Sequence, residues 1–189
     1  MKGISLELSN GHFDIVKGAE FAAYGGGMPL LCFEENGIMH VITNPDGGGL
    51  YDGQIVIPET ARLENITIKL KCCSIMADEL NAGIFELSMS ESSAEFVNIN
   101  ARRINVSTGR SNLVMNAAPV ISAEFKCGFG NVSIVLAKNK RGYFYTTECG
   151  KGQLIINSQQ QKRKYSAGIS GGIPIYVQCG LGTVDIRNN

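Results

Sequence analysis

The sequence CGFGNVSI at residues 127–134 returns as CGKGQLII at 149–156 and as CGLGTVDI at 179–186. Each copy places two glycines before a short segment in which apolar and polar residues alternate, the pattern of a half-buried strand. Glycine allows the tight bend that a corner between two strands needs. The three copies therefore predict a corner followed by a strand, repeated along the chain.

A longer period surrounds these copies. From Leu63 onward the chain divides into segments of about 20 residues, at 63–82, 83–101, 102–120 and 121–141, and each opens with an alternating strand pattern. Self-similarity at this period indicates a solenoid, in which each turn buries its apolar face by stacking on its neighbours. We therefore predict an all-β fold, a parallel β-helix or β-roll of stacked turns of about 20 residues. Its interior is predicted to hold Ile68, Leu70, Leu87, Met89, Val106, Leu113, Phe125, Val132, Ile134, Leu154, Ile156, Val184 and Ile186.

The N-terminal third is less regular. Glycine runs at 25–27 and 47–49 predict turns, and a hairpin-like segment covers 32–43. Helix signals are few, and segments 17–24 and 77–82 are each long enough for only one or two helical turns. We predict a single domain over 1–189, with less regular turns and a cap at 1–62 and regular repeats at 63–189.

Composition excludes several classes of function. The chain has 189 residues, of which 44% are hydrophobic and 18% charged, and no apolar run approaches the ~20 residues that span a bilayer. Seventeen basic residues balance seventeen acidic ones, so we expect no nucleic-acid partner. The N-terminus lacks the apolar core of a signal peptide. A cytoplasmic location is expected for the chain as written, and a cell-surface location if a leader has been trimmed from it.

Residues with reactive side chains form no recognisable catalytic or metal-binding motif. Only His12 and His40 are present, no Cys-x-x-Cys pair occurs, and no acidic pair, such as Glu86 and Glu124, is singled out by the sequence. We expect no catalytic residue, no metal and no cofactor, and therefore no enzyme.

The six cysteines are expected to be reduced and mostly buried, because a chain of this size needs no disulfide staples. Three of them recur in the corner motif, and Thr108 takes the same place one turn earlier. We predict that Thr108, Cys127, Cys149 and Cys179 occupy equivalent positions on successive turns and form an internal ladder.

The most polar and basic segment is QQQKRK at 159–164, which is expected to form a solvated loop. Its cations, Lys162, Arg163 and Lys164, are the candidate contacts for an anionic partner such as an acidic polysaccharide or a lipid head group.

Two features give a resemblance to a known family. They are DGQIVIP at 52–58, which leads into the repeated strands, and the Gly-x-apolar-x-Ile strand that ends each turn. With these the chain resembles the putative bacterial adhesin family, a domain of unknown function. The resemblance implies a single-stranded right-handed β-helix and no catalytic residues.

The leading hypothesis for function is a binding or adhesion-type module that presents a β-helical surface to an unknown protein or glycan. An alternative is a self-assembling cytoplasmic scaffold of the bactofilin type, in which the ends of subunits stack into homo-oligomers. A third is a polysaccharide lyase or glycosidase, since β-helices can host such sites in grooves along their sheets.

Overall fold

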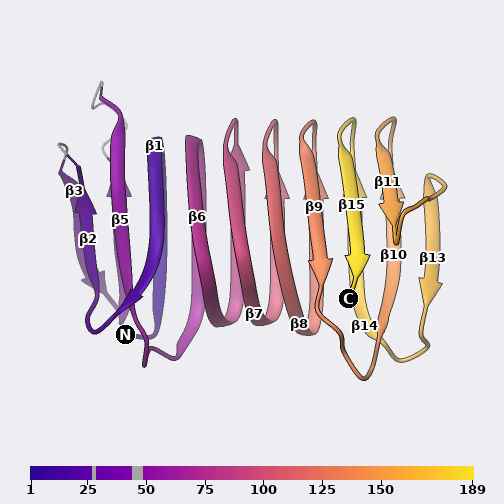
Figure 1. The fold of residues 1–189 in the computed structure, drawn as a ribbon, viewed down its shortest axis with the longest axis horizontal. Helices are drawn as coiled ribbons and strands as arrows, with labels where there is room; N and C mark the ends of the chain where they lie inside the picture. The colour runs from indigo at the N-terminus through magenta and orange to yellow at the C-terminus, as the bar shows by residue number, and fades with distance from the viewer. Residues whose placement is uncertain (27–28, 44–48) are drawn as a thin grey trace.

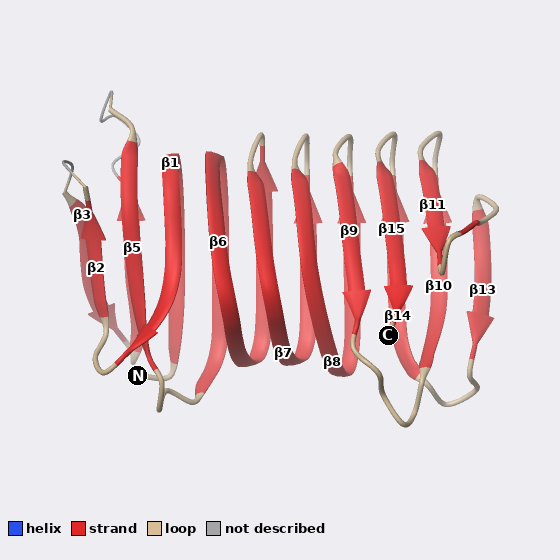
Figure 2. Ribbon diagram, in the orientation of Figure 1, coloured by secondary structure: helices blue, strands red, loops and turns tan. Residues whose placement is uncertain are grey.

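The computed structural model describes residues 1–26, 29–43 and 49–189, and every regular element in these ranges is a strand (Figures 1 and 2). The strands are β1 (Gly3–Gly18), β2 (Ala22–Gly25), β3 (Leu30–Glu35), β4 (Ile38–Thr43), β5 (Tyr51–Pro58), β6 (Leu63–Ser90), β7 (Ser93–Thr108), β8 (Asn112–Cys127), β9 (Asn131–Leu136), β10 (Tyr143–Cys149), β11 (Gln153–Ile156), β12 (Gln159–Gln160), β13 (Lys164–Gly168), β14 (Ile173–Cys179) and β15 (Thr183–Asn188).

The two short helical turns expected at 17–24 and 77–82 are wrong. The first segment joins β1 to β2, and the second lies inside β6. Neighbouring strands override the local helix preference, because Ile75 to Ala82 pair with Ala94 to Ala101 of β7. Nowhere in the described ranges is there a helix that could cross a membrane.

The central strands are parallel and are related by a constant step along the chain. Ile75 pairs with Ala94, Ala94 with Leu113 and Leu113 with Val132. Side-chain hydrogen bonds between neighbouring turns likewise join residues 19 apart. This step is close to the predicted period of about 20 residues. The prediction of an all-β fold rich in parallel strands is confirmed, whereas a right-handed β-helix or β-roll stays a prediction.

The strands of the stack form two layers, and each long strand bends at the lower edge and contributes to both of them (Figure 1). The first half of β8 pairs with β9, and its second half pairs with β14. Register shifts in the pairing of β7 with β8, one of them between Ala101 and Arg103, accompany this bend. We call the layer that contains β9, β11 and β15 the front layer and the layer that contains β10, β13 and β14 the back layer. Bends close the stack along the lower edge in Figure 1, and loops close it along the upper edge.

The core lies between the two layers, because alternate side chains of every strand point inward. All of the predicted interior residues are buried, from Ile68 and Leu70 in the early turns to Val184 and Ile186 in the last. Phe85 and Phe96 pack edge to face inside it, with ring centroids 5.5 Å apart.

The order of the turns in space differs from their order in the sequence. Cys127 pairs with Cys179, and Cys179 pairs with Cys149, so that β14 and β15 lie between the turns that precede them in the chain. The yellow strand β15 between β9 and β11 shows this in Figure 1. The predicted ladder of equivalent positions exists, but the expectation that it follows the sequence order is wrong. All three copies carry the same local pattern, so local pattern alone does not decide which two become neighbours.

Both ends of the stack are closed by antiparallel strands. At the N-terminal end β2 pairs with β5 and β3 with β4, and at the C-terminal end β12 pairs with β11 and β13 with β10. The predicted hairpin at 32–43 is confirmed as β3 and β4, joined through Asn36 and Gly37, whose φ angles are 54° and 82°. Positive φ at both central residues is the requirement of a type I′ turn. The predicted glycine turns at 25–27 and 47–49 lie partly outside the described residues.

Candidate functional site

The predicted basic segment, 159–164, lies at the C-terminal end of the stack. The expected loop covers only 161–163, because residues 159–160 form β12 and Lys164 begins β13. Lys162, Arg163 and Lys164 are all exposed. The backbone carbonyl of Arg163 accepts a hydrogen bond of 2.7 Å from the backbone N–H of Cys149, which ties the loop to β10. The Lys164 ammonium lies 3.5 Å from the Glu148 carboxylate. One of the three cations is therefore compensated locally.

A shallow depression of about 470 Å³ on the outer face of the back layer adjoins Lys164, and we call it the back-layer depression. Strands β8, β14, β10 and β13 lie side by side there, and they place their outward side chains in rows. The lining includes Tyr176, whose ring is nearly half exposed, together with Glu124, Thr146, Lys164, Ser166 and Gln178. Hydroxyl, amide, carboxylate and ammonium groups thus surround one exposed aromatic ring.

Glu86 and Glu124, the example of an acidic pair, lie in one row on this face with Asn105 between them. The Asn105 amide donates to Glu86 at 3.5 Å, and the Lys126 ammonium lies 2.9 Å from Glu124. Each carboxylate thus has its own partner, and a whole strand separates the two. The structure does not bring them together as a catalytic pair.

A second hollow of about 310 Å³ opens between the layers at the lower edge of the C-terminal end, and we call it the C-terminal cleft. It lies where the front strands β9, β11 and β15 end, and where β10 and β13 form the back wall. The side chains that matter for its chemistry are Lys138, Tyr143, Tyr145, Asn157, Tyr165 and Asn188.

Hydrogen bonds hold the hydroxyl groups of two tyrosines of this cleft in place. The Tyr145 hydroxyl donates to Oδ1 of Asn188, and the Tyr143 hydroxyl donates to the carbonyl of Ala137. Burial raises the pKa of Tyr143, and it raises the pKa of Tyr145 to about 12. Both phenols are therefore neutral at physiological pH, and Lys138 is the one charged side chain among the described residues that line the cleft.

A serine, a histidine and an aspartate meet on the outer face of the front layer, an arrangement that sequence reasoning missed. His12 Nδ1 lies 2.8 Å from the Ser74 hydroxyl, and Nε2 lies 3.3 Å from the Asp14 carboxylate. His12 and Asp14 are exposed, and β1 is hydrogen-bonded to β5 on one side and to β6 on the other. Only the register of β1 on β6 joins His12 to Ser74, and no local pattern reveals that register.

His40 has a different environment. Its ring stacks on Phe33 of the neighbouring strand, with centroids 4.8 Å apart and planes 10° apart. Neither histidine lies in a cluster of three or more His, Cys, Asp or Glu side chains, and the part of the chain that the structure describes holds no such cluster.

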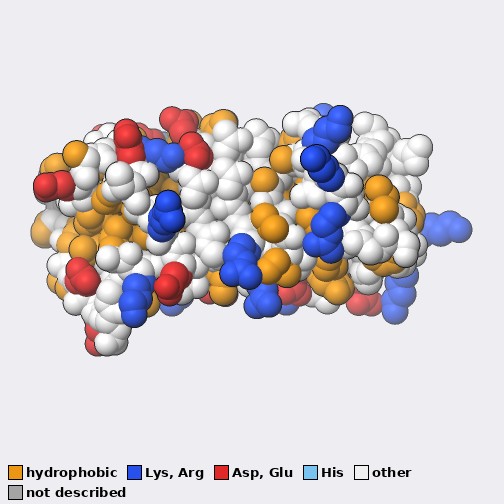
Figure 3. Space-filling model, turned by 90° about the horizontal axis from the view of Figure 1, so that it is seen from below, with side chains coloured by type: hydrophobic (Ala, Val, Ile, Leu, Met, Phe, Trp, Pro, Cys, Tyr) orange, Lys and Arg blue, Asp and Glu red, His pale blue; other side chains and the backbone are white. Residues whose placement is uncertain are grey.

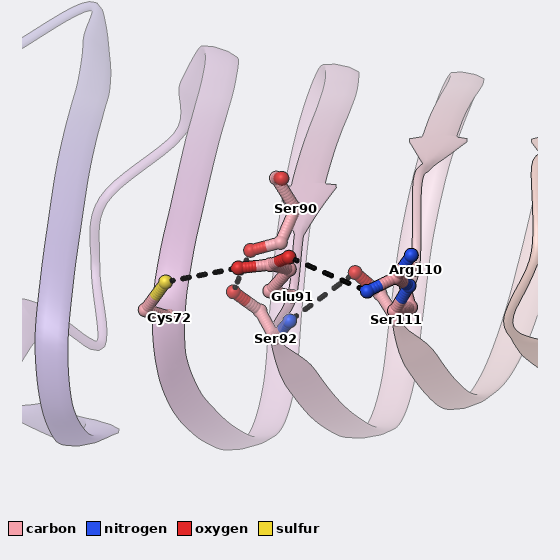
Figure 4. A network of polar contacts seen from close by, with 6 residues as sticks. All are labelled: Cys72, Ser90, Glu91, Ser92, Arg110 and Ser111. Carbon is pink, nitrogen blue, oxygen red and sulfur yellow. Dashed lines mark hydrogen bonds and ion pairs between the residues drawn. The ribbon is translucent and has the colours of Figure 1, made fainter.

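The upper corners carry a polar network (Figure 4). Cys72 Sγ lies 3.5 Å from Glu91, and Arg110 lies 3.9 Å from the same carboxylate. The Ser92 backbone N–H donates to the Ser111 hydroxyl at 3.2 Å. These contacts join residues one turn apart, so the network ties consecutive corners together.

The cysteines of the corner motif point inward. Cys127 donates to the carbonyl of Gly130 at 3.3 Å, and Cys179 donates to that of Gly182 at 3.1 Å. Burial raises the pKa of Cys127, and it raises the pKa of Cys179 to about 12. Four thiols are buried, at Cys73, Cys127, Cys149 and Cys179, whereas Cys32 and Cys72 are exposed. The buried thiols of the corner motif serve as packing groups, which fits the predicted internal ladder.

Comparison with known proteins gives a likeness in fold. No protein-family model and no curated protein matches the sequence. Among solved structures, the chain is similar to a "putative cell adhesion protein" from Clostridium sporogenes, with a TM-score of 0.60 and 13% identity, over 99% of this chain and 92% of that chain. The two chains share a fold. The likeness is in fold, and it agrees with the all-β fold that the resemblance drawn from the sequence implies.

A "putative adhesin" from Bacteroides fragilis is similar over 100% of this chain and 92% of that chain, with a TM-score of 0.36 and 10% identity. We rest no argument on this second likeness, because the TM-score is low.

Proposed function

We propose that the protein is a non-enzymatic binding module of the adhesion type, a right-handed β-helical stack whose outer surface contacts a glycan or protein partner. The back-layer depression carries this proposal. Tyr176 presents an aromatic face on a rigid sheet, and polar side chains such as Thr146 and Gln178 surround it. A few oriented polar groups around an apolar surface are the usual composition of a recognition site.

The chemistry of the described surface supports a binding role over catalysis. The Ser74, His12 and Asp14 group lies on the open face of strands that pair with neighbours on both sides, and strand pairing uses the backbone N–H groups that an oxyanion hole would need. Glu86 and Glu124 each have a separate partner. A glycosidase typically needs a carboxylate pair in a cleft.

The proposal includes display at the cell surface, in contrast to the cytoplasmic location expected for the chain as written. The name of the Clostridium sporogenes protein, which refers to cell adhesion, supports that setting. The scaffold alternative is less well supported, because the antiparallel strands at both ends interrupt parallel stacking between copies.

The test compares two tyrosines on an array of neutral and acidic glycans and by pull-down of surface proteins. Tyr176→Ala is expected to weaken binding at least tenfold. Tyr24→Ala, which removes an exposed ring on β2 at the other end, is expected to leave binding within twofold. Equal binding by both variants and the parent chain would refute a role for the back-layer depression. Filaments in electron microscopy at high concentration would favour the scaffold instead.

A further inference from the structure

We propose that the C-terminal cleft binds an acidic sugar residue whose carboxylate pairs with Lys138. This inference rests on the proposed role as a binding module, and it names a second site with its own ligand chemistry.

The cleft is open because the bend that closes the other turns is missing there. In β7 and β8 the strand runs without a break from the front layer to the back layer. In contrast, β9 ends at Leu136, and residues 137–142 form a loop before β10 begins. The lower edge therefore lacks its covering strand at this end of the stack.

Two glycines allow the walls of the cleft to pack closely against each other. A Cβ atom added at Gly168 would lie 2.2 Å from the Tyr143 carbonyl oxygen, and one added at Gly142 would lie 2.2 Å from Cδ1 of Ile169. Both residues line the cleft, and both have positive φ angles, of 138° and 63°. The walls therefore have no room for a further side chain of their own. The volume of about 310 Å³ lies at the lower end of the range for small-molecule sites.

The cleft also holds hydrogen-bond donors that the protein leaves free. Oδ1 of Asn188 accepts from Tyr145, and Oδ1 of Asn157 accepts from the backbone N–H of Asn188 at 2.9 Å. These bonds fix which way each amide points. Within the described residues, neither Nδ2 group donates to a protein acceptor, so both are available to sugar oxygens.

Charge selects an acidic ligand over a neutral one. Lys138 has no ion-pair partner in the described part of the chain, and no Asp or Glu side chain lines the cleft there. The adjoining Lys140 and Arg141 likewise lack a carboxylate partner in the described residues, and the Arg141 guanidinium donates to the carbonyl of Gly171 at 3.2 Å. Seen from below, most of the acidic side chains lie toward the N-terminal half, whereas lysine and arginine stand out over the C-terminal half (Figure 3). A carboxylate beside Lys138 would form a charge-assisted hydrogen bond.

The experiment uses trigalacturonic acid and its methyl ester, which has the same rings without the charge, in isothermal titration calorimetry at low salt. The acid is expected to bind at least tenfold more tightly than the ester. Lys138→Met should remove this difference, and Lys151→Met, which changes an exposed lysine at the upper corner, should keep it. Asn188→Asp retains the acceptor for Tyr145 but adds a negative charge, so it should weaken binding of the acid more than that of the ester.

Thermal unfolding checks that each variant is folded. Equal affinity for acid and ester, or an unchanged difference in Lys138→Met, would overturn the cleft proposal, and the Tyr176 result on the array would still decide the proposed function separately. Displacement of the acid by a DNA oligonucleotide at the same concentration of negative charge would also overturn the cleft proposal. The lysine and arginine side chains would then bind any polyanion and not an acidic sugar in particular.

Discussion

The sharpest structural prediction concerns the second glycine of the corner motif. A Cβ atom at Gly182 would lie 2.1 Å from the carbonyl oxygen of Gly130 and 2.9 Å from Cys127 Sγ. That carbonyl already accepts from the Thr183 N–H at 2.9 Å and from the Cys127 thiol at 3.3 Å. In Gly182→Ala the Gly130 carbonyl would have to move away from the new methyl group, which would disturb both hydrogen bonds and the pairing of β15 with β9.

Gly182→Ala is therefore expected to cost about 3 kcal/mol of unfolding free energy, the upper part of the range for overpacking. For a chain of this length that corresponds to a fall in Tm of roughly 6–12 °C, measured by circular dichroism. Gly109→Ala is the control at the first glycine position of an earlier corner, because its nearest contact would be the Met89 carbonyl oxygen at 3.5 Å. Neither glycine has a φ angle in the left-handed region, so the comparison isolates steric clash. Similar losses in both variants would refute the reasoning.

Two further predictions concern titratable groups. In native protein without reductant, a thiol reagent should modify Cys32 and Cys72 quickly and the four buried cysteines only after unfolding; fewer than six thiols in the unfolded chain would show disulfides and contradict the reduced ladder. The contribution of Tyr145 to stability should be full below pH 10 and should be lost as pH rises from 10 toward 12, because its folded-state pKa is raised above the ordinary value of 10.0 to about 12. The Tyr145 phenol accounts for about 2–3 kcal/mol of this loss in unfolding free energy. Urea unfolding at pH 10 and pH 12 should therefore show a smaller loss in Tyr145→Phe than in the parent protein. Equal losses in the two proteins would assign the alkaline sensitivity to other groups.

The inward faces of the strands were predictable from sequence, and the pairing order was not. The alternation of apolar and polar residues determines that the side chains of Val132 and Ile134 point into the core, because a shift of one residue would expose both. It says nothing about which strand lies beside them. The copies at 149–156 and 179–186 have the same pattern, and only contacts between distant residues decide that Val184 lies next to Val132.

The candidate sites divide in the same way. Composition alone was enough to single out Lys162, Arg163 and Lys164, which the structure places on the surface. The C-terminal cleft combines residues from 138 to 189 that belong to β10, β11, β13 and β15 and to the segments that follow or precede these strands. The one local signal for it is the pair Tyr143 and Tyr145, whose alternation is equally typical of an ordinary strand.

The unexpected strand order and the cleft have a common origin. Because β14 and β15 occupy the positions next to β8 and β9, the chain that leaves β9 has to pass beyond them before it can form β10. Residues 137–142 make this crossing below the end of β15, where the Asn189 N–H donates to the Leu136 carbonyl at 3.0 Å and the Tyr143 hydroxyl binds Ala137. A turn stacked in sequence order would have bent directly into the back layer, as β8 does, and would have covered this edge. The crossing loop instead leaves the edge between the two layers open and places Lys138 at the mouth of the cleft. The departure from sequence order therefore creates the site that we propose for the acidic ligand.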